Sequence, residues 1–299
     1  MTKHFSALPA RGLRGAAALA ATALALTLTA CSSSDGERTG TTSGSGTALS
    51  HIHGLGVRGD TLYVATHQGV HTPDAAGRPT PVGDRRDDFM GFTIAPDGTF
   101  LASGHPAPGT GGPADLGLVA STDAGLTWRT RSLAGKVDFH ALDTASDATV
   151  YGYDSANGLL RVSADGVTWD DRAALRALDI AVSPAAPGTV LATTETGVVR
   201  STDGGRTFVP ASDRVVAYVD WASPDALFAV DPDGVLYRGS GGGTGWTRVS
   251  SVPGGAPQAL TVVDAGRLLV ATQDGVYESR DAGRTFTRRV TVTSGNAEH

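Results

Sequence analysis

The sequence predicts an all-β fold, a six-bladed β-propeller spanning residues 51–291. Three observations lead to it. The chain has 40 glycines and only 18% charged residues, a short Ser/Asp motif returns at a regular spacing, and two apolar segments precede each copy. A repeat of about 40 residues containing four strands is typical of one propeller blade. Six repeats fill the range, so we expect six blades around a central channel.

The Ser/Asp motif sets the register of the repeat. Its complete copies are "STDAGLTW" (121–128), "STDGGRTF" (201–208) and "SRDAGRTF" (279–286). Its degenerate copies are "HTPDAAGRPTPV" (71–82), "SADGVTW" (163–169) and "SGGGTGW" (240–246). Ser121, Ser163 and Ser201 are 42 and 38 residues apart. The sequence therefore predicts one loop of this kind in every blade.

Each copy follows two segments that we interpret as strands because of their β-branched residues. The first segments are "HGLGV", "MGFTIA", "HALDTA", "LDIAVS", "VDWAS" and "ALTVV". The second segments, each running through a turn into a third strand, are "TLYVATHQGV", "TFLASGHP", "TVYGYDSANGLL", "TVLATTETGVV", "ALFAVDPDGVL" and "RLLVATQDGVY". The stretch 172–182 favours a helix when taken alone, but its place in the repeat predicts strands.

The motif S-x-D-x-G-x-T-[WF] resembles the Asp-box, or BNR repeat, of sialidase-like six-bladed propellers. The chain is also similar to bacterial lipoproteins labelled glycosylhydrolase-like, in the stretches "DRRDDFMGFT", "SGHP", "DFHAL" and "GYD". In sialidase-like propellers the boxes lie on the face away from the active site. The resemblance thus implies a structural role for the box aspartates, which are Asp123, Asp165, Asp203 and Asp281.

Residues alone favour the same role. Asp and Ser side chains accept backbone N–H bonds within their own turn, and Gly supplies the positive φ that a tight hairpin needs. One reaction centre cannot use the same acid from four blades spread around a ring. We therefore expect these hairpins to be scaffold.

The N-terminus predicts export. Three basic residues precede the short apolar run 16–30, so residues 1–30 are typical of a secretory signal peptide rather than a membrane span. The signal ends in Leu-Thr-Ala-Cys, which resembles the bacterial lipobox and implies acylation of Cys31. The alternative is an ordinary cleavage site beside a lone cysteine.

Cys31 is the only cysteine, so the chain forms no internal disulfide. Residues 31–50 are predicted to be a lipidated cysteine and a Gly/Ser/Thr-rich tether, and residues 292–299 a polar tail. We expect an exported protein, lipid-anchored to the outer face of the bacterial cell membrane.

Charge excludes one class of partner. Removal of the three signal-peptide cations takes the formal net charge from −6 to −9. An acidic chain without a Lys/Arg cluster binds nucleic acid poorly, so we expect no nucleic-acid partner. We expect a monomer.

Candidate site residues come from the register. In a propeller the starts of the first strands and the ends of the second strands surround the channel mouth. Those positions hold His53, His67, His105 and His140, with Asp154. Neutral imidazoles at one place suit a divalent metal or proton transfer, so these four histidines are also the candidate metal ligands.

The loop entering the second blade adds Arg86, which could clamp a carboxylate or phosphate, and Asp88, a candidate acid or base. The candidate catalytic residues are His140, Asp154 and Asp88. Hydrolysis by two carboxyl groups would need Asp88 and Asp154 roughly 5 to 9 Å apart.

Two functions remain from this reasoning. The first is an envelope lipoprotein that binds a glycan, a small ligand or a partner protein at the channel mouth. The alternative is a glycosidase-like hydrolase, with or without a bound metal. Sialidase activity itself is disfavoured, because the first blade reads "HIHGLGV" and lacks the R-I-P motif and arginine of that family.

Overall fold

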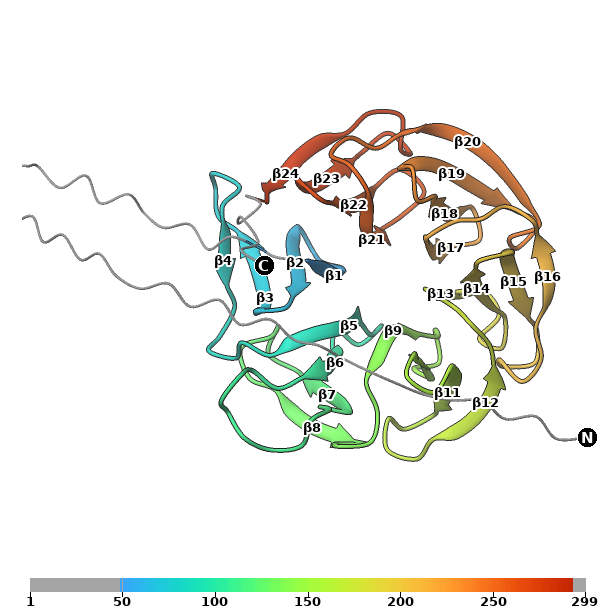
Figure 1. The fold of residues 1–299 in the computed structure, drawn as a ribbon. Helices are drawn as coiled ribbons and strands as arrows, with labels where there is room; N and C mark the ends of the chain where they lie inside the picture. Colours follow the sequence, from blue (N-terminus) through green and yellow to red (C-terminus); the bar gives the residue numbers. More distant parts are fainter. Residues whose placement is uncertain (1–48, 50, 293–299) are drawn as a thin grey trace, which may run out of the picture. The chain divides into compact units, whose positions relative to one another are not determined.

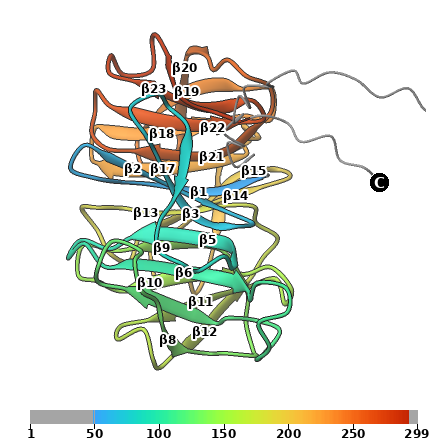
Figure 2. The same ribbon diagram turned by 90° about the vertical axis from the view of Figure 1, so that its left-hand side faces the viewer.

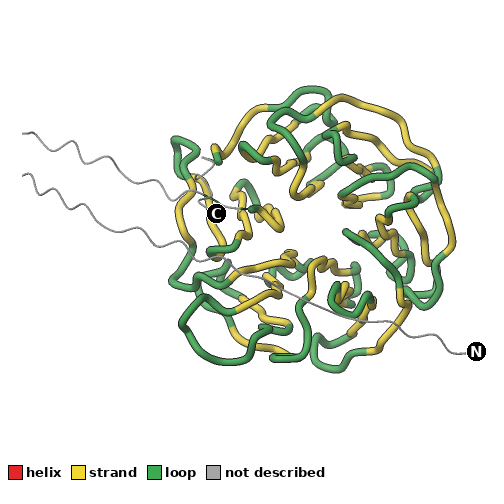
Figure 3. The backbone as a smooth tube through the Cα atoms, in the orientation of Figure 1, coloured by secondary structure: helices red, strands yellow, loops and turns green. Residues whose placement is uncertain are grey.

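The computed structural model describes residues 49 and 51–292, and these form a ring of six four-stranded antiparallel sheets (Figure 1). The predicted all-β, six-bladed propeller is confirmed, including strands and loops rather than a helix over 172–182. Figure 3 shows strands and loops throughout this part of the chain. No helix in it is long and apolar enough to cross a membrane. The predicted signal peptide, Cys31 and almost all of the tether and tail lie outside the described residues.

The strands of each blade are consecutive in the chain. Blades one to three comprise β1 (Ile52–Arg58), β2 (Thr61–Thr66), β3 (Gly69–Pro73), β4 (Pro79–Pro81); β5 (Asp88–Ile94), β6 (Phe100–His105), β7 (Leu118–Ser121), β8 (Arg129–Ser132); β9 (Phe139–Thr144), β10 (Val150–Asp154), β11 (Leu159–Ser163), β12 (Asp170–Ala174). Blades four to six comprise β13 (Ile180–Val182), β14 (Val190–Thr194), β15 (Gly197–Ser201), β16 (Val209–Ser212); β17 (Tyr218–Ser223), β18 (Ala226–Val230), β19 (Val235–Ser240), β20 (Gly245–Ser251); β21 (Pro257–Val262), β22 (Leu268–Thr272), β23 (Gly275–Ser279), β24 (Thr287–Thr291).

Strand order in every sheet follows the sequence, so the first strand of each blade is innermost and the fourth is outermost (Figure 1). The inner strands β1, β5, β9, β13, β17 and β21 contact one another in turn around the channel. Figure 2 shows the same sheets from the side, with the blades following one another around the ring. The channel is therefore lined by residues of these six strands.

The core lies between neighbouring blades, because each sheet packs one face against the preceding sheet and the other face against the following sheet. The strands β10, β18 and β22 are buried at every residue, whereas the outer strands β8 and β16 are largely exposed. Phe89, Phe100, Phe139 and Phe228 are fully buried. Burial of a side chain of this kind contributes roughly 1.5–3 kcal/mol. This packing fixes the inner strands that carry the site.

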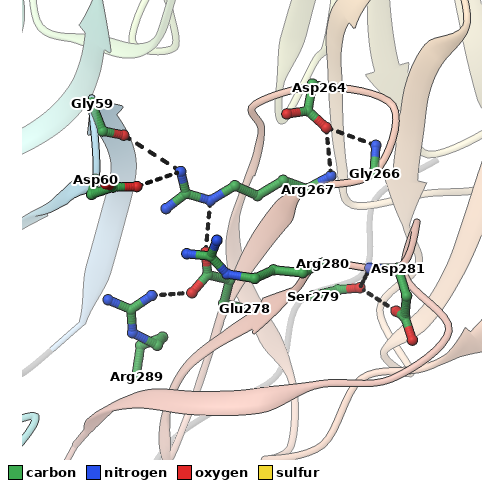
Figure 4. Close-up of polar contacts among 10 residues, drawn as sticks. All are labelled: Gly59, Asp60, Asp264, Gly266, Arg267, Glu278, Ser279, Arg280, Asp281 and Arg289. Atoms are coloured by element: carbon green, nitrogen blue, oxygen red, sulfur yellow. Dashed lines mark hydrogen bonds and ion pairs between the residues drawn. The ribbon is translucent and has the colours of Figure 1, made fainter.

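No strand is shared between blade six and blade one, since each sheet uses four strands of its own. Polar side chains join the two blades instead (Figure 4). The carboxylate of Glu278, on β23, is 2.7 Å from Nε of Arg267 and 3.0 Å from Nη2 of Arg280, and it also pairs with Arg289. Arg267 extends to blade one, where its Nη1 is 3.7 Å from the Asp60 carboxylate. The buried Glu278 thus orients an arginine that bridges the two ends of the ring.

Candidate functional site

Polar side chains gather at one end of the channel, over the first three blades. They come from the starts of inner strands and the ends of second strands, where β5 and β6 pair Asp88 with His105. We call this set the mouth cluster, and it comprises His51, His53, His67, Asp88, His105, Asp138 and His140.

Irregular strand pairing places two of these histidines. The register of β1 against β2 shifts between Ile52 and Gly54, so His53 has no opposite partner. The register of β9 against β10 shifts in the same way around His140. A β-bulge leaves its extra residue unpaired and re-aims its side chain, which is why bulges occur often beside functional sites. Both His53 and His140 line the channel cavity.

His53, His67 and Asp88 form the tightest part of the mouth cluster. The ring centroids of His53 and His67 are 4.6 Å apart, and Nδ1 of His67 is 3.5 Å from Oδ2 of Asp88. One ligand atom from each of the three lies within 4.8 Å of the other two. Nε2 of His53 and Oδ1 of Asp88 are buried and have no hydrogen-bond partner among the described residues. Two imidazole nitrogens and a carboxylate oxygen fit a divalent transition metal and leave room for a further ligand.

The electrostatics of His53 agree with a ligand role. Burial, followed by the neighbouring His67 and His51, lowers the pKa of His53 to about 4. The imidazole is therefore neutral at pH 7, which is the form that binds metals.

His140 has the opposite character. Its Nε2 is 2.8 Å from Oδ2 of Asp138, and the same carboxylate oxygen is 3.3 Å from Nε2 of His105. The hydrogen bond to Asp138 raises the pKa of His140, with further contributions from the charges of Asp138, Asp88 and Asp154 opposing the effect of burial. A histidine held in this way is suited to donate a proton. Asp138 itself is almost completely buried, and its Oδ1 has no partner in the described chain.

Two residues predicted from the sequence, Asp154 and Arg86, are not part of the mouth cluster. Asp154 is fully buried, and its carboxylate accepts bonds from Asn157 and Arg161 in the turn that follows β10. Arg86 donates from Nη1 to the backbone carbonyls of Gly83 and Arg85 instead of facing the channel. The Asp154 carboxylate is therefore engaged within its own turn, and Nη1 of Arg86 is engaged by its own loop.

Below the mouth, three aspartates enter a channel cavity of about 90 Å³. Asp143 accepts the N–H of Val182 at 2.6 Å, and Asp220 accepts that of Val262 at 2.6 Å. Asp179 does the same with Val219 at 3.0 Å. Each carboxyl group thus binds the backbone of the next blade. We call these three residues the channel aspartates.

Burial is the main cause of the raised pKa values of the channel aspartates. It raises the pKa of Asp143 to about 8, with Asp220 adding repulsion, and raises the pKa of Asp179 to about 7. It raises the pKa of Asp220 to about 6. Three carboxylates enclosed together repel one another, so the folded protein favours their protonated forms.

The motif loops form a separate set at the outer part of the blades, which we call the Ser/Asp hairpins. In the hairpin 121–128, Asp123 accepts bonds from the N–H and the hydroxyl of Thr127, and Ser121 accepts the N–H of Gly125. The hairpins of Asp203 and Asp281 repeat these bonds, and Asp165 accepts two backbone N–H groups of its own loop. The side-chain bonds of these aspartates are all local to the loop, whereas backbone carbonyls of the hairpins accept bonds from the preceding blade, as Gly166 does from Ser132 and Gly283 does from Ser250.

The site residues predicted from the sequence did not include Asp138 or the channel aspartates. Asp138 stands two residues before His140, so alternation along an inner strand places both on one side. Asp143 and Asp179 occur in the apolar inner segments of blades three and four, as Asp220 does in blade five. A single acid in the otherwise apolar inner segment of three consecutive blades was the available signal.

Comparison with known proteins bears on the fold. No protein-family model and no curated protein matches the chain. A gluconolactonase from Xanthomonas campestris is 14% identical with a TM-score of 0.60, over 75% of this chain and 84% of that one. Virginiamycin B lyase from Staphylococcus aureus is 14% identical with a TM-score of 0.55, over 77% and 83%. These similarities show the propeller fold.

A third similar structure is a GH74 enzyme from Niastella koreensis, 14% identical with a TM-score of 0.55. The match covers 81% of this chain but only 37% of the enzyme, so this chain spans about two fifths of its length. At this level of identity the likeness concerns architecture, and the function has to be argued from the site.

Proposed function

We propose that the protein is an exported lipoprotein, anchored through acylated Cys31, that binds a divalent transition metal and with it a small polar ligand at the channel mouth. The observation that carries the proposal is the convergence of one ligand atom each from His53, His67 and Asp88 within 4.8 Å. Three protein ligands with an open position are typical of sites that bind an exogenous group. The ligand can be a glycan, another small solute or a side chain of a partner protein.

Two parts of the mouth cluster have different roles in this proposal, one in metal binding and the other in ligand binding. The neutral His53, with His67 and Asp88, would hold the metal. Asp138 raises the pKa of His140 and holds its ring beside them, where it can donate a hydrogen bond to an anionic or carbonyl oxygen of the ligand. The metal would supply Lewis acidity to a bound ligand.

Calorimetric titration of the chelator-treated mature protein with Zn²⁺ tests this proposal. We expect one site per chain, and His53→Ala should weaken Zn²⁺ binding by more than about 100-fold, beyond the 10–100-fold typical of changes outside the ligand set. His105→Ala is the matched control, because His105 lies in the same cluster but pairs with Asp138. Absence of saturable Zn²⁺ binding, or an equal loss in both variants, would contradict the proposal.

The anchor has its own test. In a bacterial host with lipoprotein processing, Cys31→Ser should move the protein from the membrane fraction to the soluble exported fraction. Retention of the variant in the membrane at wild-type levels would refute anchoring through Cys31.

The second candidate function is glycosidase-like hydrolysis, favoured by the His140–Asp138 pair. A histidine with a raised pKa can protonate a leaving oxygen, while Asp138 keeps its ring oriented. Asp88, with a buried unpartnered oxygen, is the remaining carboxylate at the mouth. Turnover of any member of a panel of glycosides and sugar lactones that is lost in His140→Gln would establish it, and no turnover across the panel would leave ligand binding as the function.

A further inference from the structure

We propose that a second site, separate from the channel mouth, binds a phosphate group in the groove between blades five and six. This groove has a volume of about 530 Å³. Its charged lining residues are Arg238, Arg248 and Arg284, and no acidic side chain is among the described residues that line it. The charged residues that line this groove are thus all cationic, although the chain has a formal net charge of −6.

The guanidinium groups of this groove have neutral partners. Arg238 donates from Nη2 to the backbone carbonyl of Asp225 at 2.7 Å, and its guanidinium lies 5.8 Å from the centre of the Phe228 ring. Arg248 donates to the hydroxyl of Ser251 at 2.9 Å. Arg284 donates to the backbone carbonyl of Asp281 at 3.0 Å. These bonds orient the three side chains through neutral acceptors, and the nearby Asp225 carboxylate interacts with the charge of Arg238 alone among the three.

The groove between blades three and four offers an internal comparison. It has a similar volume of about 580 Å³ and a similar position, but Asp147, Asp165, Asp170 and Asp203 line it along with its arginines. Nε of Arg172 is 2.8 Å from Oδ2 of Asp170, and Nη2 of Arg206 is 3.6 Å from the same atom. The arginines of that groove are compensated by carboxylates.

Equivalent positions of blades three and five show which residues make the two grooves differ in charge. Two residues after the hairpin serine, blade three has Asp165 and blade five has Gly242. Seven residues after it, blade three has Asp170, which lines its groove, and blade five has the neutral Thr247. The groove of blade five thus lacks acids at both positions, and Arg248 on β20 adds a cation to its lining. The degenerate motif of blade five therefore coincides with a new charge pattern.

The arrangement favours a tetrahedral phosphate over a planar carboxylate. The arginines belong to three separate elements, namely β19, β20 and the hairpin 279–286, so they line the groove from different sides. Guanidinium groups bind phosphate oxygens through paired N–H donors, and a tetrahedral phosphate accepts them from several directions, whereas a carboxylate is planar. Because Arg248 and Arg284 are exposed, binding should weaken as salt is added.

Titration of the chelator-treated mature protein with inorganic phosphate at low ionic strength, followed by NMR, tests the inference. We expect saturable binding that Arg248→Ala and Arg284→Ala each weaken at least 5-fold. Arg206→Ala is the matched control, because Arg206 and Arg284 each stand five residues after their hairpin serine and Arg206 lies in the compensated groove. Its phosphate affinity should equal that of the wild type.

Several outcomes decide the matter. No saturable phosphate binding by the wild type, or equal weakening by Arg206→Ala, overturns the proposal. If Arg248→Ala unfolds, Arg248→Lys keeps the charge without the planar fork and should weaken binding by an intermediate factor; unchanged binding overturns it. Zn²⁺ affinity should be the same in Arg248→Ala as in the wild type, so this site and the mouth cluster fail or stand separately.

The source of the phosphate is distinguished with vesicles, using the Cys31→Ser protein as background. Co-sedimentation with phosphatidylglycerol vesicles but not phosphatidylcholine vesicles, lost in Arg248→Ala, assigns the phosphate to a lipid headgroup. Phosphate binding without co-sedimentation assigns it to a soluble phosphate ester.

Discussion

The Ser/Asp hairpins and the channel use the same side chain in opposite ways. In the hairpins, the hydroxyl of Thr127 is the first cause that lowers the pKa of Asp123 to about 2, and that of Thr285 does the same for Asp281. In the channel, burial raises the pKa of Asp143 to about 8 and that of Asp220 to about 6. An exposed carboxylate surrounded by donors is stabilised as an anion, and an enclosed one beside other carboxylates is not.

The two regions also differ in what their bonds connect. A hairpin aspartate binds its own loop, so it shapes one turn and nothing beyond it. A channel aspartate binds the next blade, so it links successive sheets around the ring. The regularly repeated acid is therefore local scaffold, and the groups with unusual acidity lie in the channel and at its mouth.

The largest expected effect on stability separates the two regions. Asp143→Ala removes the side-chain acceptor of two N–H groups, those of the buried Val182 and the half-buried Thr144. An unsatisfied buried donor costs roughly 1–3 kcal/mol, so we expect a loss of about 2–5 kcal/mol in the free energy of unfolding measured with urea. Asp123→Ala should lose clearly less, because water can replace its bonds. Equal losses would remove the distinction between inter-blade and local carboxylates.

The pH dependence of stability is the next largest effect. The pKa of Asp143 is about 8 in the folded protein against an ordinary 3.8, so the folded chain binds its proton more tightly. Its contribution to stability is complete below about pH 4 and is lost as pH rises toward about 8. The hairpin aspartates have lowered pKa values, so their contribution is present above about pH 4 and lost as pH falls toward 2.

Urea unfolding across pH 4 to 9 measures the channel contribution. We expect Asp143→Asn, which cannot ionise, to lose less stability than the wild type between pH 4 and 8. Asp203→Asn should keep the wild-type slope in that interval. A wild-type slope in Asp143→Asn would mean that this carboxyl group is not protonated in the folded state.

A smaller effect concerns the mouth cluster. Asp138→Asn removes the carboxylate that raises the pKa of His140, so we expect that pKa to fall toward or below 6.5. NMR titration of the imidazole Cε1–H resonances of the metal-free protein measures it. Asp115→Asn is the control, because Asp115 contacts His105 and not His140. A His140 pKa that does not respond to Asp138→Asn would contradict the assigned pair.

The smallest effect is expected from the hairpins. Asp203→Asn keeps the shape of the side chain and most acceptors of its loop, so Zn²⁺ affinity and phosphate affinity should both stay within about 2-fold of the wild type. A larger change in Zn²⁺ affinity would show that the hairpins communicate with the channel mouth.

The sequence predicted the fold because the repeat spacing is a property of the chain alone. Counting from Ser121 gave six blades, and the register then brought His53, His67, His105 and His140 to one end of the channel. Strand position is enough for that inference, since the first strands of all blades begin at the same mouth.

The remainder depends on contacts that spacing does not contain. Asp154 has a channel position in the register, but Asn157 and Arg161 in its own turn bind its carboxylate. The bulges that direct His53 and His140 toward the channel arise from pairing irregularities that no single residue marks. The pKa values of the channel aspartates are raised only when the ring closes and encloses these side chains together.

The central claim is that chemistry is concentrated at the channel mouth while the Ser/Asp hairpins are scaffold. The most direct test is an anomalous difference map from crystals of the mature protein grown with Zn²⁺, recorded at the zinc absorption edge. The account predicts one strong peak bounded by His53, His67 and Asp88. A map without a peak there, or with its strongest peak at Asp123, Asp203 or Asp281, would contradict it.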